Sequence, residues 1–365
     1  MALTHLNIDH VRNLSQVRLQ TLSQVNVFHG RNGSGKTSVL ESIHLLGMAR
    51  SFRGSSIKSL ITHGCDTCTV FGQVSEPGRA GTQAIGVQRS RKGDAQIKIG
   101  GSPVKVLAEL AEQLPLQVIT ADSFNLLTGP PGGRRQFLDW GVFHVEHQFF
   151  SQWQRFQRCL KQRNMLLRRG KLSDQELAVW TRDLVAAGTE IHNYRKAYFS
   201  HLVPRFESIL ARLAPSLKGV SLGYRRGWDK QLGYGEVLEQ SVATDIEQGY
   251  THSGPQRADV RVMAEGHLAA ETLSRGQQKL VVCALKLAQG QLKSELGGGG
   301  CTYLIDDLPS ELDADHSRQV CSLLSDLGAQ VFITCVDPEE ILSVWPTGNE
   351  LGMFHVEQGK IRSGE

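Results

Sequence analysis

The sequence has 365 residues, of which 40% are hydrophobic and 21% charged, and its formal net charge is +4. A chain of this length and hydrophobic content can form one large or two ordinary domains with their own cores, so a mainly disordered protein is not expected. The N-terminus lacks the features of a signal peptide, no run of about 18 apolar residues occurs, and the seven cysteines lie mostly in apolar runs. We therefore expect a soluble cytoplasmic protein with reduced cysteines and no membrane partner.

A short apolar run at residues 25–28 is followed by GRNGSGKT and then by an amphipathic stretch. This order predicts a strand, a glycine-rich loop and a helix, and the spacing of Gly30, Gly35, Lys36 and Thr37 matches a phosphate-binding loop. Lys36 would reach the β- and γ-phosphates of ATP, and the Thr37 hydroxyl would ligate Mg²⁺. The expected ATP-binding residues of this loop are Gly30, Arg31, Asn32, Gly33, Ser34, Gly35, Lys36, Thr37 and Ser38.

The segment 144–213 is predominantly helical by pattern. Apolar residues at spacings of three and four, over 149–167 and again over 177–198, predict two seams that face each other. Each helix would have about 25 to 40 residues, so the pair would form a short hairpin. The turn between them contains Ser173 and Glu176, which would cap the second helix.

No acidic residue occurs between residues 147 and 173, although several basic ones do. A solvated helix face is the usual explanation for a charge run, whereas a complete lack of acids favours contact with phosphates. Both interpretations stay open here. If the second is right, duplex DNA would be bound by Arg155, Arg158, Lys161, Arg163, Arg168 and Arg169.

Residues 272–280 read TLSRGQQKL and open an amphipathic helix. Ser274 is a good N-cap residue, and Gln277, three residues later, completes a capping box. Capping does not call for a glycine at position 276, where a helix former would be about 1 kcal/mol better. Gly276 therefore indicates a backbone position that another group approaches closely.

Residues 302–307, TYLIDD, predict a buried strand that ends in two carboxylates. A Mg²⁺ ion held by Thr37 needs a carboxylate from a neighbouring strand, and Asp306 is expected to supply it. Asp307 is expected to act as the catalytic base beside the attacking water, with Lys36 as the other catalytic residue. The separation of 270 residues between Lys36 and Asp306 indicates an insertion between the two strands.

The order of phosphate loop, LSRGQ, two acids, SELD and a further apolar strand is that of ABC-type ATPase heads. Three other segments, VRNL at 11–14, GPPGGRRQFLD at 129–139 and SGPQRAD at 253–259, resemble segments of the RecF family. This family consists of short-armed relatives of the chromosome-maintenance and break-repair ATPases. The resemblance covers essentially the full length of the chain.

The sequence departs from the family pattern at three positions. Ala121 replaces a usual proline, and Gln256 stands where histidine is usual. Thr334 occupies the strand position at which many ABC proteins have a histidine. The roles of these positions are therefore left open.

The resemblance implies an α/β fold in which an ABC-type ATPase head, with a mixed sheet and the phosphate loop, carries a helical lobe with a short antiparallel hairpin. We expect residues 1–120 and 251–365 to form the two parts of the ATPase lobe and residues 121–250 to form the helical lobe. The resemblance also adds nucleotide-binding residues: Arg12 and Asn13 within one subunit, and Ser274, Arg275, Gly276 and Gln277 across a dimer.

The resemblance further implies an ATP-dependent DNA-binding protein of recombinational repair and replication restart. Such a protein forms a head-to-head homodimer with ATP, hydrolyses ATP slowly with Mg²⁺, binds duplex DNA and its junctions with single strands, and helps RecO and RecR proteins to load RecA. One alternative is the nucleotide-binding subunit of an ABC transporter, against which the long separation of the motifs counts. Another is a small-molecule phosphotransferase, which would have no use for LSRGQ or SELD.

Overall fold

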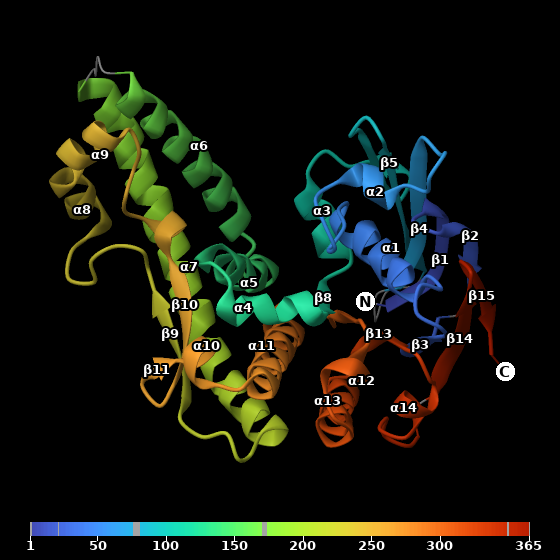
Figure 1. Ribbon diagram of the computed structural model, residues 1–365. Helices are drawn as coiled ribbons and strands as arrows, with labels where there is room; N and C mark the ends of the chain where they lie inside the picture. The colour runs from blue at the N-terminus through green and yellow to red at the C-terminus, as the bar shows by residue number, and fades with distance from the viewer. Residues whose placement is uncertain (1, 21, 76–80, 170–173, 349, 365) are drawn as a thin grey trace. The chain divides into compact units, whose positions relative to one another are not determined.

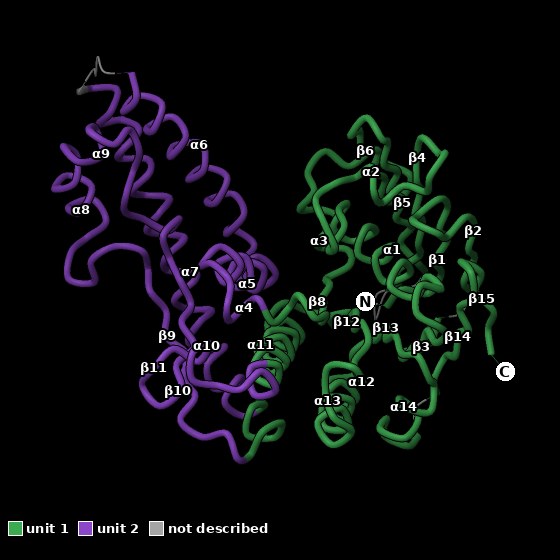
Figure 2. The backbone as a smooth tube through the Cα atoms, viewed as in Figure 1, with its two compact units in different colours: residues 1–124, 209–215, 279–365 green, residues 125–208, 216–278 purple. Residues whose placement is uncertain are grey.

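The computed structural model describes residues 2–20, 22–75, 81–169, 174–348 and 350–364. The chain divides into two compact units (Figure 2). Unit 1 contains Met1–Phe124, Ile209–Pro215 and Lys279–Glu365, and unit 2 contains Asn125–Ser208 and Ser216–Gln278.

A six-stranded mixed sheet of unit 1 has the strand order β15-β14-β3-β13-β12-β8. All neighbours are parallel except β15, which pairs antiparallel with β14. The central strands VNVFH, TYLI and QVFITC are almost wholly buried because they carry mainly apolar and β-branched side chains. Parallel pairing brings the carboxyl ends of β3 and β12 to the same edge of the sheet. The strands are β3 Val25–His29, β8 Leu116–Ile119, β12 Thr302–Ile305, β13 Gln330–Cys335, β14 Leu351–Glu357 and β15 Lys360–Ser363.

A second, antiparallel sheet of unit 1 has the order β2-β1-β4-β5-β6-β7. Helix α1 (Lys36–Met48) contacts β1, β4 and β5 of this sheet and β12 and β13 of the mixed sheet, so it lies between the two (Figure 1). The strands are β1 Ala2–Val11, β2 Leu14–Leu19, β4 Thr67–Ser75, β5 Thr82–Ser90, β6 Ala95–Ile99 and β7 Ser102–Pro103. The other helices of unit 1 are α2 Ile57–Leu60, α3 Leu107–Gln113, η1 Ala121–Phe124, α12 Leu308–Glu311, α13 Ala314–Asp326 and α14 Glu339–Leu342.

Unit 2 combines helices with a small antiparallel sheet of order β11-β10-β9. Helices α7 and α11 each begin in unit 2 and end in unit 1. No helix in the described ranges is long and apolar enough to cross a lipid bilayer. The elements are α4 Asn125–Thr128, α5 Pro131–Val145, α6 Phe149–Arg168, α7 Asp174–Leu213, β9 Val220–Arg225, α8 Tyr234–Gln240, α9 Val242–Gln248, η2 Pro255–Arg257, β10 Asp259–Ala264, β11 His267–Leu268, α10 Ala269–Thr272 and α11 Arg275–Leu296.

Helices α6 and α7 form the predicted antiparallel hairpin (Figure 1). Their inward seams are buried, for example at Phe156 and Ile191, and an ion pair of 3.0 Å between Arg155 and Asp183 joins their outer faces. With 20 residues, α6 is shorter than expected, whereas α7 has 40. The predicted cap residue Ser173 lies outside the described part of the chain.

The division of the chain differs from the boundaries expected from sequence. Residues 251–278 were assigned to the ATPase lobe, but they belong to unit 2 because β10 pairs with β9 and packs against α5. The last turns of α7, in turn, belong to unit 1.

Candidate nucleotide-binding site

The glycine-rich loop joins the end of β3 to the start of α1, as predicted. Gly30, Gly33 and Gly35 all have positive φ angles, of 143°, 78° and 121°. At Gly30 a Cβ atom would also lie 2.3 Å from the carbonyl oxygen of Val356. Glycine is thus required at position 30 by both backbone conformation and space, and the loop leads into a helix N-terminus, where anions bind.

The Lys36 side chain folds back over this loop. Its Nζ donates to the carbonyl oxygens of Gly30, at 2.6 Å, and Arg31, at 3.2 Å. The Arg31 side chain points to solvent, whereas the Ser34 hydroxyl is buried and has no hydrogen-bond partner among the described residues. A buried ammonium and an unpaired hydroxyl at the N-terminus of a helix are suited to an anionic ligand.

Asn13 holds the loop from the side. Its Nδ2 donates to the carbonyl oxygen of Ser34 at 3.0 Å, and its Oδ1 accepts from the Ser38 hydroxyl at 3.0 Å. Both polar atoms of the Asn13 amide therefore form hydrogen bonds with this segment. Asn13 positions the loop and also lines the cleft in front of it.

Glu41 was missed by the sequence analysis. This carboxylate of α1 is completely buried and accepts two hydrogen bonds of 2.8 Å from Arg12. It also accepts from the Ser51 hydroxyl, which in turn accepts from the backbone N–H of Arg53. Glu41 thus fixes two neighbouring segments that both line the cleft. A single acidic residue in the largely apolar helix that follows a phosphate loop is the signal that the sequence offers.

The two predicted metal ligands are in direct contact. The Thr37 hydroxyl lies 2.9 Å and 3.2 Å from the carboxylate oxygens of Asp306, although the residues are far apart in the sequence. Thr334, which is completely buried, donates to Asp306 Oδ1 at 2.8 Å and accepts from the backbone N–H of Asp307 at 2.9 Å. The residue that departs from the ABC pattern therefore positions both acids.

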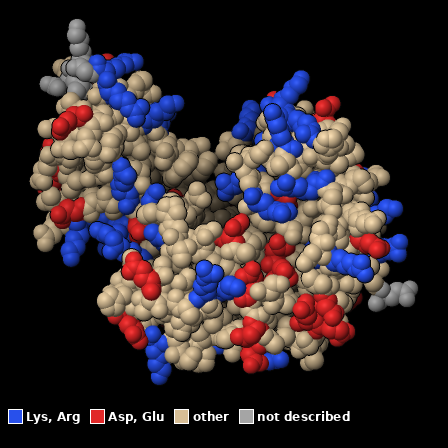
Figure 3. All heavy atoms as spheres, in the orientation of Figure 1, with Lys and Arg blue, Asp and Glu red and all other residues tan. Residues whose placement is uncertain are grey.

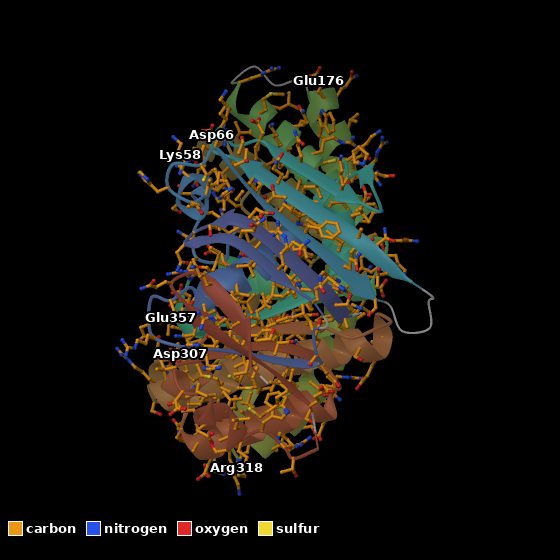
Figure 4. The ribbon with its side chains drawn as sticks, turned by 90° about the vertical axis from the view of Figure 1, so that its right-hand side faces the viewer. Lys58, Asp66, Glu176, Asp307, Arg318 and Glu357 are labelled. Atoms are coloured by element: carbon orange, nitrogen blue, oxygen red, sulfur yellow. The ribbon has the colours of Figure 1, made fainter. Side chains whose placement is uncertain are left out.

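Asp307 has a left-handed backbone, with φ of 56°, and starts helix α12. Its carboxylate accepts from the Ser310 hydroxyl at 2.7 Å and remains partly exposed to the cleft. Figure 4 shows Asp307, Glu357 and Lys58 along one edge of unit 1.

The cleft in front of the loop has a volume of about 640 Å³ and is formed by unit 1 alone. Of the predicted residues, it is lined by Arg12, Asn13, Asn32, Gly33, Gly35, Lys36, Thr37, Ser38, Asp306 and Asp307. Its rim adds two exposed cations that the sequence analysis did not select, Arg53 and Lys58. The cleft therefore presents both cations and carboxylates to a ligand.

The segment 274–277, in unit 2, forms the predicted capping box. The backbone N–H of Ser274 donates to Gln277 Oε1 at 3.0 Å, and the backbone N–H of Gln277 donates to the Ser274 hydroxyl at 3.3 Å. All four residues, including Arg275, are exposed, and no atom lies within 4 Å of a Cβ built at Gly276. Packing within this chain therefore gives no reason for the glycine.

The predicted DNA-binding residues in α6 and at its C-terminal end differ in exposure. Arg158, Lys161, Arg168 and Arg169 are exposed, and Lys and Arg side chains gather over α6 in Figure 3. Arg155 is half-buried in its ion pair with Asp183.

The prediction for Arg163 is wrong. This side chain is 1% exposed and donates to Asp245 at 2.8 Å and to Thr251 at 2.6 Å. A single-sign charge run does not reveal which helix face each residue occupies, and position 163 faces the core of unit 2.

The segments at 129–139 and 253–259, which carry much of the family resemblance, meet in unit 2. Arg134 makes a two-point contact with Asp259, at 2.8 Å and 3.2 Å. Arg195 of α7 binds Asp139 at 2.7 Å and the carbonyl oxygen of Pro255 at 2.8 Å. These contacts lock α5, α7 and β10 together, which is a structural role.

Comparisons with known proteins agree with this geometry. Residues 2–362 match the family model described as RecF/RecN/SMC N terminal domain. A curated protein of Stutzerimonas stutzeri named DNA replication and repair protein RecF is 53% identical over 99% of this chain and 97% of its own. Its namesake from Pseudomonas aeruginosa is 52% identical over the same shares of the two chains.

Two solved structures share the fold. A structure entitled recombination mediator protein RecF-ATP in RecFOR pathway has a TM-score of 0.85 at 24% identity and covers 100% of this chain and 97% of that one. An SMC head bound to the C-winged helix domain of ScpA has a TM-score of 0.61 at 15% identity, with coverages of 100% and 98%. The predicted ABC-type ATPase head is thereby confirmed, and the chain belongs to the RecF family.

Proposed function

We propose that this protein is an ATP-dependent switch that acts on DNA in recombinational repair and replication restart. The observation that carries the proposal is the contact of Thr37 with Asp306 in front of the phosphate loop, which brings together two motifs separated by most of the chain. The name shared by relatives at 52–53% identity favours a DNA function over the transporter alternative.

The donor set of the cleft fits magnesium and ATP. Lys36 would exchange its two loop carbonyl oxygens for phosphate oxygens, and the Ser34 hydroxyl would gain a partner. Thr37 and Asp306 offer the hard oxygen ligands that Mg²⁺ prefers. When bound, the nucleotide would supply a γ-phosphate whose presence or loss distinguishes two states of the protein.

Asp307 would orient the attacking water and accept its proton. Thr334 would hold this acid through its backbone N–H while it keeps Asp306 in place. An aspartate is one methylene shorter than the glutamate common in ABC enzymes, so we expect slow, magnesium-dependent hydrolysis. Fast hydrolysis without a partner would contradict this expectation.

The exposed segment 274–277 would complete the site of a second subunit. Its exposed helix N-terminus suits a γ-phosphate, and the open space at Gly276 allows close approach. ATP binding would thereby favour a head-to-head homodimer. The exposed cations of α6 would then contact duplex DNA at gaps, where the protein would act with RecO and RecR in loading RecA.

Sedimentation velocity with ATP, with ADP and without nucleotide tests the dimer. Wild type should dimerise with ATP alone. Lys36→Ala should remain a monomer because it binds ATP weakly, whereas Ser274→Arg should bind ATP normally and still remain a monomer. Ser102→Arg, at an exposed serine of β7, is the matched control and should dimerise. A wild-type protein that stays monomeric with ATP would contradict the cross-dimer site.

A further inference from the structure

Unit 2 contains a second and larger cleft, of about 1360 Å³. Its walls are β9, the exposed face of α7 around Lys196 and Phe199, and the connection 226–231 between β9 and α8. Strand β9 is an edge strand, because the sheet order is β11-β10-β9. Gly223 at its centre has no atom within 4 Å of a Cβ position, so the cleft reaches the backbone of this strand.

The cleft is strongly cationic. Its two carboxylates are Asp229 and Asp259, and Asp259 already binds Arg134. Figure 3 shows Lys and Arg side chains gathered over the part of unit 2 that contains β9. The basic residues that line the cleft are Lys196, Arg225, Arg226, Lys230, Arg257 and Arg261.

Most of these cations are not paired with a carboxylate of the described residues. Within the described residues, Lys196, Arg225, Lys230 and Arg261 form no ion pair, and all four are exposed. Grouped cations without counterions around a concave surface attract an extended anion. Unlike Arg163, they are available to a ligand.

Aromatic rings line the same cleft. His192 stacks on Tyr224 with ring centres 5.7 Å apart, and Phe199 lies 5.8 Å from Tyr224. The Arg226 guanidinium lies 4.8 Å above the ring of Trp228. Burial, followed by the charges of Arg226 and Lys196, lowers the pKa of His192 to about 4. His192 is therefore a neutral ring at physiological pH.

We infer that this cleft binds single-stranded DNA, with the phosphates on its cations and the unpaired bases against its rings. Aromatic platforms combined with a positive groove are how proteins bind single strands without sequence preference. A duplex would use the charges but could not offer base faces to the rings, because its bases are stacked on one another. The inference rests on the proposed DNA function and assigns the single-stranded side of a junction to unit 2.

Fluorescence anisotropy with a labelled oligo(dT) of about 20 nucleotides and a duplex of equal length tests the cleft over a salt series. Arg225→Ala/Lys230→Ala/Arg261→Ala should flatten the slope of log affinity against log salt for the single strand by about 2, as expected for three lost phosphate contacts. The matched control removes the same charge from exposed lysines of unit 1, with Lys92→Ala/Lys98→Ala/Lys105→Ala. An equal change in both triple variants would overturn the inference.

A second variant tests the rings. Phe199→Leu keeps an apolar side chain but removes an aromatic face, so oligo(dT) should bind about 5- to 100-fold more weakly. An abasic strand of the same length should bind wild type and variant equally. Equal loss with both strands would mean that stacking is not involved. If wild type binds duplex but no single strand, this inference alone fails; if it binds neither, with or without ATP, the proposed function fails too.

Discussion

Each unit contains a completely buried carboxylate that is paired with an arginine. In unit 1, Glu41 accepts two hydrogen bonds of 2.8 Å from Arg12. In unit 2, Asp245 accepts one of 2.8 Å from Arg163 and two more from the backbone and ring of His252. The pairs differ in the cation: Arg12 is 23% exposed and lines the nucleotide cleft, whereas Arg163 is 1% exposed.

This difference shows that an arginine–carboxylate pair does not by itself mark a functional site. The pair of unit 2 joins α6 to α9 and to the segment at Thr251, and it is almost completely buried. The pair of unit 1 fixes a cation at the edge of a cleft, where one side remains available to a ligand. We expect exposure of the cation to separate a structural from a functional role, and substitutions at Arg163 and Arg12 test this division.

The largest expected effect is that of Arg163→Ala. Its removal leaves Asp245 buried without its cation, so the free energy of unfolding should fall by about 3–5 kcal/mol. Urea unfolding of the full chain measures this. Arg158→Ala, on the exposed face of the same helix, is the control and should change stability by less than about 0.5 kcal/mol. Similar stabilities of the two variants would refute the structural role of Arg163.

Acid should test a different buried group, the imidazole of His44, which is neutral at pH 7. His44 of α1 donates its Nδ1–H to the carbonyl oxygen of Arg50, and burial lowers its pKa to about 4. Between the unfolded pKa of 6.5 and about 4, the unfolded state binds the extra proton, so stability falls as the pH falls. From about pH 7 to about pH 4.5 the loss should reach about 2–3 kcal/mol.

The control for this pH effect is His44→Gln, which removes the titrating group. Urea unfolding at a series of pH values should show a flatter dependence for this variant than for wild type over the same window. Parallel curves would mean that other groups cause the acid sensitivity.

The contrast between the two arginines also explains what could be predicted from sequence. Motifs with fixed spacing, such as the loop at Lys36 and the cap of Ser274 with Gln277, have the predicted local structure because neighbouring residues determine it. The burial of Arg163 depends on Asp245, 82 residues away, and no periodicity within α6 reveals that partner.

Thr334 and the unit boundaries were beyond sequence reasoning for a related reason. The function of the Thr334 hydroxyl follows from parallel pairing of β12 with β13, which brings it to Asp306. The assignment of residues 251–278 to unit 2 follows from antiparallel pairing of β10 with β9. Both are long-range pairings that one sequence alone does not specify.

Compared with Arg163→Ala, Arg12→Ala should reduce stability less and ATP affinity more. Removal of this side chain opens Glu41 to the water of the cleft, so the loss should be about 2 kcal/mol, less than for Arg163→Ala. ATP affinity, measured by titration calorimetry, should fall because a cation and the support of the loop at Asn13 are both disturbed. Lys58→Ala, at the rim of the same cleft, controls for charge alone. Unchanged ATP affinity in Arg12→Ala would place Arg12 with Arg163 as a purely structural residue.

The smallest change in stability is expected for the exposed cations of α6. In Arg158→Ala/Lys161→Ala/Arg169→Ala no buried carboxylate loses its partner, so urea unfolding should match that of wild type. Duplex DNA affinity should nevertheless respond, with a slope of log affinity against log salt that is flatter by about 3 for three lost phosphate contacts. If this triple variant instead keeps the wild-type slope, the acid-free run of α6 is only a solvated face, and exposure of a cation is not sufficient for a functional role.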